Sequence, residues 1–128
     1  MKILLDTHVF IWMCTGNDLL SPTARSAILD SHSRLYLSVA SYWEMCVKIS
    51  IGKLELHPLW SALCEREMQK NGIAWQSIRP EHCERVAALP LHHRDPFDRM
   101  LVVQAQQEEM TILSADENLR NYDVKVVW

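Results

Sequence analysis

The sequence has little glycine and little proline: of its 128 residues, 3 are glycine and 5 are proline. No segment rich in glycine and serine, no run of like charges, no internal repeat and no low-complexity segment interrupts it. The chain therefore has no candidate linker, and we expect a single domain over residues 1–128. At this length and with 48% hydrophobic residues, such a domain buries roughly two thirds of the surface of its unfolded chain.

Long hydrophobic runs and paired cysteines are also missing. The first apolar run, residues 3–5, ends at Asp6, so it is too short for a signal-peptide core or a membrane span. The four cysteines lie far apart and include no Cys-x-x-Cys pair, which excludes a zinc ribbon and a thioredoxin-like redox site. We therefore expect a soluble, cytoplasmic protein with reduced, buried thiols and no membrane contact.

Positive charge is scarce as well. The formal net charge is −3 at pH 7, whereas a dedicated binder of duplex DNA is usually basic overall. Any contact with nucleic acid must therefore come from a local basic patch that acts together with bound cations.

Segments of strand character alternate with segments of helix character along the whole chain. Short apolar or β-branched runs predict strands at residues 2–6, 34–38, 73–78, 110–114 and 124–127. Helical periodicity with caps and stop signals predicts helices at residues 7–14, 21–31, 39–50, 59–71, 80–89 and 96–109. This alternation predicts an α/β fold in which a mostly parallel sheet is covered by helices on both faces.

Acidic residues stand where predicted strands end and predicted helices begin. Asp6 ends the first strand, Asp116 follows the fourth, Asp98 lies near the start of the last helix, and Glu44 lies in the first turns of the third. Ligands of open parallel sheets bind outside the carboxyl ends of the strands, so these four acids are expected at one site. Oxygen ligands without Cys or His favour Mg²⁺ or Mn²⁺, and such an ion activates water for phosphodiester hydrolysis.

Three of these acids have a purely structural alternative, which for Asp116 is a place in a plain turn after the fourth strand. Asp6 could cap the following helix, although Thr7 beside it can also do so. Residues 41–44 have the spacing of a capping box, in which Glu44 would reach back to the backbone of Ser41. If the helix instead begins at Ser38, Glu44 is free to face the site.

The segment from His92 to Met100 contains two further candidates. Asp95 suits the N-cap and Pro96 the first position of a helix, while Asp98 is the acid expected to bind metal. Asp95 either caps the helix or supports the site from behind the metal ligands. Arg94 and Arg99 flank these acids and make either ion pairs with them or contacts with RNA phosphates.

Two other kinds of residue near the acids have a predicted role. Thr7 and Ser114 are expected to support the site from behind the metal ligands, and Ser114 could hydrogen-bond a ligand water or another carboxylate. The histidines at 8, 92 and 93 have no partner at metal-ligand spacing, so we interpret them as solvated or hydrogen-bonded rather than as ligands.

Four short motifs resemble the PIN domain, and more narrowly the toxin ribonucleases of VapBC-type toxin–antitoxin pairs. In chain order they are Leu4-Leu5-Asp6-Thr7, Trp43-Glu44, Asp95-Pro96-Phe97-Asp98 and Ser114-Ala115-Asp116. The resemblance covers essentially the whole chain. It implies a three-layer α/β/α sandwich and Mg²⁺- or Mn²⁺-dependent cleavage of RNA by an acidic cluster, carried here by Asp6, Glu44, Asp98 and Asp116.

The same resemblance implies a homodimer that is inhibited by a cognate antitoxin, whose tail enters the active-site groove. Two positions depart from the common pattern of the family. Leu119 stands where an aromatic residue often follows the last acid by three positions, and Asp95 is an additional acid that only part of the family has. Neither departure removes an expected ligand.

Two other functional classes compete with this hypothesis. A haloacid-dehalogenase-like phosphatase also has an Asp after its first parallel strand, but it needs a second acid two residues later, where this chain has His8. A catalytically silent PIN-like scaffold that only binds protein or RNA would be expected to lose acids, and this chain keeps them.

Overall fold

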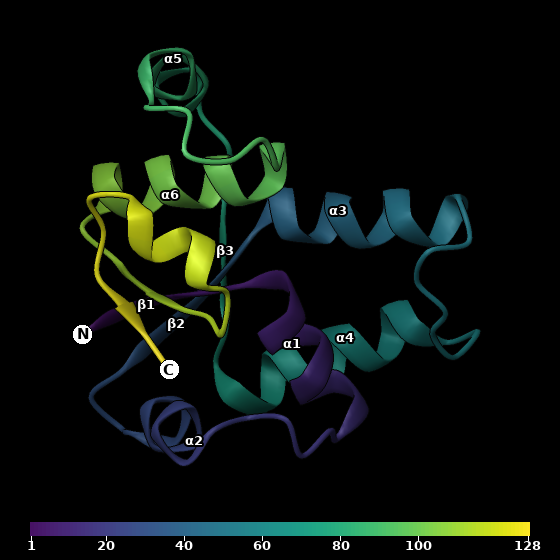
Figure 1. Ribbon diagram of the computed structural model, residues 1–128. Helices are drawn as coiled ribbons and strands as arrows, with labels where there is room; N and C mark the ends of the chain where they lie inside the picture. The colour runs from purple at the N-terminus through teal and green to yellow at the C-terminus, as the bar shows by residue number, and fades with distance from the viewer.

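Five parallel strands form the centre of the molecule. The computed structural model describes all residues from 1 to 128 (Figure 1). The strands are β1 (Lys2–Leu5), β2 (Arg34–Ser38), β3 (Ala74–Gln76), β4 (Thr111–Leu113) and β5 (Val126–Val127), in the order β3-β2-β1-β4-β5. Every neighbouring pair is parallel, so all five strands end at the same edge of the sheet.

Helices make the connections between these strands. They are α1 (Thr7–Thr15), α2 (Pro22–Leu29), α3 (Val39–Ser50), α4 (Trp60–Asn71), α5 (Pro80–Ala88) and α6 (Pro96–Glu108), with a 3₁₀ helix, η1 (Glu117–Asn121), between β4 and β5. None of these helices has the combination of length and apolar character that crossing a membrane requires.

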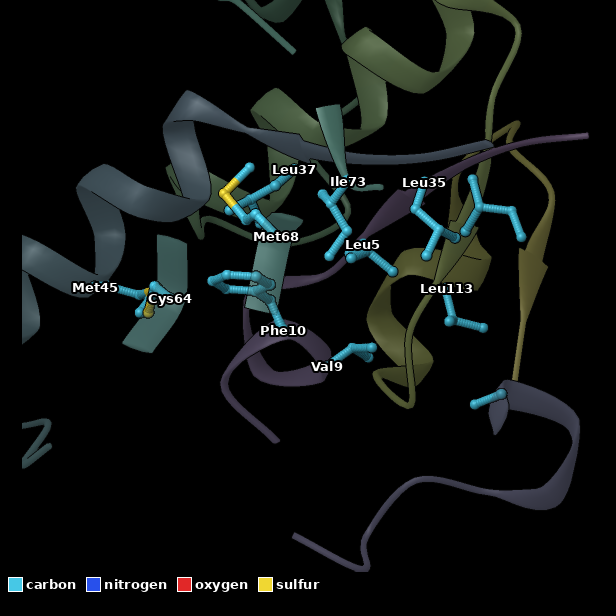
Figure 2. Close-up of a cluster of buried hydrophobic side chains, with 12 residues drawn as sticks. Leu5, Val9, Phe10, Leu35, Leu37, Met45, Cys64, Met68, Ile73 and Leu113 are labelled. Atoms are coloured by element: carbon cyan, nitrogen blue, oxygen red, sulfur yellow. The ribbon is translucent and has the colours of Figure 1, made fainter. Parts of the chain in front are cut away.

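Each face of the sheet packs against its own helices. Alternate residues of β1 point to opposite faces, so Ile3 and Leu5 enter one apolar cluster and Leu4 the other. The first cluster joins β1 and β2 to α1, α2 and α4 (Figure 2). The second joins the sheet to α6 and η1, with α5 packed on the far side of α6 (Figure 1). These are the three layers of an α/β/α sandwich.

The predicted alternation of strands and helices and the three-layer class are confirmed, and the sheet is wholly parallel. The predicted strands at residues 73–78 and 124–127 are too long, because β3 and β5 are edge strands that each pair with one neighbour over two or three residues. The turn expected to carry Asp116 is the start of η1.

Candidate active site

Asp6 lies where β1 ends and α1 begins, at the carboxyl edge of the central strand. Its Oδ1 accepts from the backbone N–H of Thr7 at 2.7 Å, so Asp6 is itself the N-cap of α1. Its Oδ2 accepts from Ser114 Oγ at 2.6 Å. Ser114 therefore has the second of its two predicted roles, because it holds a carboxylate of a strand more than a hundred residues away in sequence.

The prediction that Thr7 can cap α1 is wrong. Thr7 is the first helical residue, and its side chain is turned to α3, where Oγ1 donates to Glu44 Oε1 at 2.6 Å. Asp6 caps α1 instead, because its carboxylate accepts the hydrogen bond of the otherwise unpaired Thr7 N–H at the start of the helix.

Glu44 is buried in the second turn of α3, with 2% of its surface exposed. The helix begins after Ser38, whose side chain accepts from the Ala40 N–H, so the capping-box alternative at Ser41 does not hold. Glu44 is thereby free of the backbone, but both its oxygens are in use: Oε1 by Thr7 and Oε2 by Lys48, one turn later on α3. Glu44 is an acid of the site whose charge is already balanced by a lysine.

Asp95 and Asp98 have different roles at the start of α6. Asp95 is the N-cap, since its Oδ1 accepts from the N–H groups of Phe97 and Asp98 at 2.9 and 3.1 Å. Pro96 occupies the first helical position, where no N–H is needed. Neither carboxylate oxygen of Asp98 accepts a hydrogen bond from the backbone, and 8% of the residue's surface is exposed. The predicted capping role of Asp95 is confirmed.

Asp116 lies on the segment that leaves β4. Its N–H donates to Ser114 Oγ at 3.0 Å, and its Oδ1 accepts from the Asn118 N–H at 2.9 Å, which caps η1. Ser114 therefore links Asp116 to Asp6 through its single hydroxyl. The side chain of Asp116 is partly exposed and has its second oxygen unused.

Arg99 does not make the predicted phosphate contact, and it forms no ion pair with the acids either. It is buried, and its guanidinium donates to the carbonyls of Val86, Leu89 and Pro90 and to the hydroxyl of Tyr122. Its planar group of five donors suits several carbonyls at the end of α5, and the sequence carries no signal of this. Arg94 is exposed and remains available.

A chain of hydrogen bonds leads from Arg99 to Asp98. The Tyr122 hydroxyl oxygen accepts from Arg99 Nη1 at 3.1 Å and from the His93 N–H at 3.3 Å, so its own proton is free for His93 Nδ1 at 2.8 Å. His93 Nδ1 is then an acceptor, and Nε2–H donates to Asp98 Oδ2 at 3.2 Å. His93 is a hydrogen-bonded histidine, as predicted, but its position at the site was not anticipated.

The electrostatics of the site are dominated by Asp98. Burial, followed by the charges of Asp6, Asp95, Asp116 and Glu44, raises the pKa of Asp98 to about 8. Burial also raises the pKa of Asp6, against the opposing effect of the Ser114 hydrogen bond. Five acids from four segments therefore lie close enough to repel one another, and the one side-chain partner of Asp98 is His93.

The chemistry of this donor set fits a hard divalent cation. The available ligands are carboxylate oxygens, and an ion among them would remove the repulsion that keeps Asp98 protonated. The side chains as placed do not surround one point with three or more ligands. Asp6, Asp98 and Asp116 would have to draw together around an ion, and Glu44 would have to leave Lys48 to join them.

Comparison with known proteins agrees with this geometry. The sequence matches the family model of the PIN domain over residues 3–125. This chain belongs to the PIN-domain family. PIN domains are generally metal-dependent nucleases, and the family accounts for acids at the carboxyl edge of a parallel sheet. No curated protein matches the chain in sequence.

The fold of this PIN domain is similar to three solved toxin–antitoxin structures. For VapBC2 from Rickettsia felis, bound to a DNA fragment from their promoter, the TM-score is 0.76 with 9% identity over 99% of this chain and 98% of that chain. For VapBC-1 from nontypeable Haemophilus influenzae the TM-score is 0.70 with 14% identity over 99% and 97%. For FitAcB from Neisseria gonorrhoeae it is 0.56 with 19% identity over 98% and 96%.

Three residues of the site were missed from the sequence. His93 lies inside the acidic segment, so its position five residues before Asp98 was a usable signal. Lys48 follows Glu44 by four residues, which is the spacing of an ion pair on one helix face. Tyr122 is placed only by the long-range packing of η1 on the sheet, and no local pattern indicates it.

We expect Asp98→Asn to stabilise the metal-free protein as pH rises. The pKa of Asp98 is near 3.8 in the unfolded chain and about 8 in the folded one, so folding retains its proton and the wild type loses stability between about pH 4 and pH 8. Asparagine has no proton to lose. In the presence of a chelator, urea unfolding should show the variant to be more stable by about 5 kcal/mol at pH 8.

Below pH 4 the two proteins should unfold alike, because the carboxyl group is then protonated in both the folded and the unfolded chain. A stability difference that does not change between pH 4 and pH 8 would show that Asp98 is ionised in the folded protein.

Tyr122→Phe tests the chain of hydrogen bonds that ends on Asp98. Without the hydroxyl, His93 Nδ1 loses its donor and the ring is no longer fixed with its Nε2–H toward Asp98. Partners of this kind typically change metal affinity 10- to 100-fold, so we expect Mn²⁺ binding to weaken about 10-fold in titration calorimetry. The matched control is Tyr36→Phe, a partly buried tyrosine of β2. Equal Mn²⁺ affinity in Tyr122→Phe and wild type would contradict the role of this chain.

Proposed function

We propose that this PIN domain is a Mg²⁺- or Mn²⁺-dependent endoribonuclease and the toxin of a toxin–antitoxin pair. The observation that most strongly supports catalysis is the raised pKa of Asp98, which burial and four neighbouring acids bring to about 8. Asp6, Asp95 and Asp116 each cap a helix and Glu44 pairs with Lys48, whereas Asp98 has neither role and is the acid that the others repel. This group of acids becomes useful when a divalent cation occupies it.

The proposed ligands of the cation are Asp6, Asp98 and Asp116, with Glu44 available once Lys48 releases it. A bound Mg²⁺ or Mn²⁺ would supply a water of lowered pKa and would stabilise the charge that develops on the phosphate. The oxygen donors favour these ions over zinc, for which Cys and His ligands would be expected.

The residues of the chain itself fix the acids in place. Ser114 and the Thr7 N–H hold the two oxygens of Asp6, and His93 holds one oxygen of Asp98. These hydrogen bonds restrict the orientations of the Asp6 and Asp98 side chains before a cation binds. Such preorganisation reduces the reorganisation needed when substrate arrives.

RNA as the substrate is supported by the family resemblance and by the distribution of charge. The net charge of −3 argues against a protein that binds long duplex DNA through its overall field. Of the two arginines first considered for phosphate contacts, Arg94 is exposed beside the capping Asp95 and is the one we assign to an RNA phosphate.

The toxin assignment includes three further proposals. A cognate antitoxin covers the active-site groove, the chain forms a homodimer, and the protein acts in the cytoplasm, where its RNA substrate is found. The solved structures with this fold include VapBC and FitAB assemblies, two of them bound to DNA fragments. These support the antitoxin proposal by analogy of fold.

The competing classes are less consistent with the structure. In a phosphatase of the haloacid-dehalogenase type, a second acid would follow Asp6 by two residues, and His8 stands there, exposed to solvent. A silent scaffold would not need to keep buried acids that repel one another. An assay of cleavage distinguishes the scaffold from the nuclease.

The proposed activity predicts cleavage of single-stranded RNA by the purified protein in Mg²⁺ or Mn²⁺ and none in EDTA. Asp6→Asn and Asp98→Asn should each lower the rate at least 100-fold, because each removes a charged ligand of the ion that activates water. Gel analysis of an end-labelled RNA measures the rate.

Asp123→Asn is the control, an exposed acid outside the site that should leave the rate unchanged. Cleavage that persists in EDTA, or in both site variants, would contradict a metal-dependent nuclease. A folded protein that cleaves no RNA in either ion would favour the scaffold.

A further inference from the structure

A hollow of about 310 Å³ opens beside the acids, and the proposed hydrolysis leaves it without a role. Asp6 and Asp116 form its acidic wall, His8 and Trp12 of α1 form its aromatic wall, and Val9 and Ala115 complete the lining. The volume lies at the lower end of the range for small-molecule sites, which suits a single planar ring system with its attached group. The hollow therefore joins the place for a cation to an aromatic surface.

The aromatic wall is held in position. His8 and Trp12 are four residues apart on α1, with their ring centroids 6.1 Å apart. Trp12 is supported from another direction by Trp128, the last residue, at a centroid distance of 5.7 Å. Trp12 is partly exposed and His8 is exposed, so neither ring is fully buried in the core and both can contact a ligand. A fixed, half-open indole loses little conformational freedom when a flat ligand packs on it.

The two walls together specify the chemistry of the ligand. The aromatic wall favours a flat π-system, and the acidic wall favours a phosphate bridged by a divalent cation. A nucleotide carries both groups on one sugar. Bases of single strands are commonly recognised by stacking on aromatic side chains, which duplex structure prevents.

We propose that this hollow binds one unpaired nucleobase of the RNA, stacked on Trp12 beside His8, with the adjoining phosphate directed to Asp6 and Asp116. The proposal rests on the proposed ribonuclease function and adds that the substrate is unpaired at the cleavage site.

A neighbouring hollow indicates that the ligand is a chain of nucleotides rather than a single nucleotide. It measures about 240 Å³, shares His8 with the first, and is lined by Lys48 and Lys53. Lys48 is held by Glu44, whereas Lys53 is exposed and forms no ion pair. The backbone phosphate of the next nucleotide would therefore meet a positive charge on the other side of His8.

The test combines protein variants with RNAs that lack one base. A labelled single-stranded RNA of twelve nucleotides is titrated in EDTA, so that binding is measured by fluorescence anisotropy without cleavage. A single abasic site is moved along the RNA. At one position it should weaken binding to wild type about 10-fold, the effect of losing one stacked base.

The same abasic site should have no further effect on Trp12→Leu, because base and indole form one interaction. Trp12→Phe should retain part of the penalty and provides a second variant if the leucine protein fails to fold. Trp75→Leu is the matched control, a half-exposed tryptophan of β3 that should leave the penalty at its wild-type value. Lys53→Ala should weaken intact and abasic RNA equally, as a phosphate contact does.

Several results would overturn the proposal. They are an abasic penalty that is the same in Trp12→Leu and wild type, no penalty at any position, or no binding of single-stranded RNA either in EDTA or in Mg²⁺. Trp12 variants that bind RNA normally but lose an antitoxin or change the oligomeric state would assign the hollow to a protein interface instead.

The outcome is separable from that of the cleavage assay, because anisotropy in EDTA needs no catalysis. Coupling between Trp12 and one base in a protein that cleaves nothing would keep the base site and refute the nuclease. Metal-dependent cleavage without that coupling would support the nuclease and refute the base site.

Discussion

The burial of several carboxylates at one edge of the sheet is the constraint on which the rest of the site depends. A parallel sheet brings the ends of β1 and β4 together, so Asp6 and Asp116 are neighbours although more than a hundred residues separate them. The starts of α3 and α6 add Glu44, Asp95 and Asp98. Like charges in a poorly solvated place are unfavourable, and the pKa of Asp98, about 8, records that cost. The protein accepts this local instability where its chemistry is expected.

The surrounding structure reduces the cost without removing it. Asp6 receives two hydrogen bonds, Glu44 is paired with Lys48, and His93 donates to Asp98. Thr7, Lys48 and His93 lie within five residues of the acids that they contact, whereas Ser114 reaches Asp6 from a distant segment, a contact that forms only when β1 and β4 have paired. The contacts that support Asp98 continue beyond His93. Arg99 of α6 donates to a carbonyl at the end of α5 and to the Tyr122 hydroxyl, which in turn contacts His93. Asp95, Asp98 and Asp116 each retain one oxygen without a donor, and the last two are among the proposed ligands of the cation.

The sequence was sufficient to predict the architecture and which acids lie near one another. Both predictions need only the alternation of strands with helices and the fact that parallel strands end at the same edge of the sheet. The sequence also indicated that Asp95 caps α6, a local property of five residues. It left open whether Glu44 belongs to a capping box, which depends on whether the helix begins at Ser38 or three residues later. The roles of Arg99 and Tyr122 were beyond reach, since they arise from contacts between distant segments. The edge strands were overestimated because apolar runs do not show how many neighbours a strand has.

The central claim is that the acids form a site that a divalent cation completes, and proton release on binding tests it most directly. Mn²⁺ is titrated calorimetrically at pH 7 in buffers of different ionisation enthalpy, which gives the number of protons released per ion. Because the pKa of Asp98 is about 8 without metal, its carboxyl is mostly protonated at pH 7 and must ionise to bind, so the account predicts about one proton per Mn²⁺. Saturable binding without proton release, or no binding at all, would contradict it.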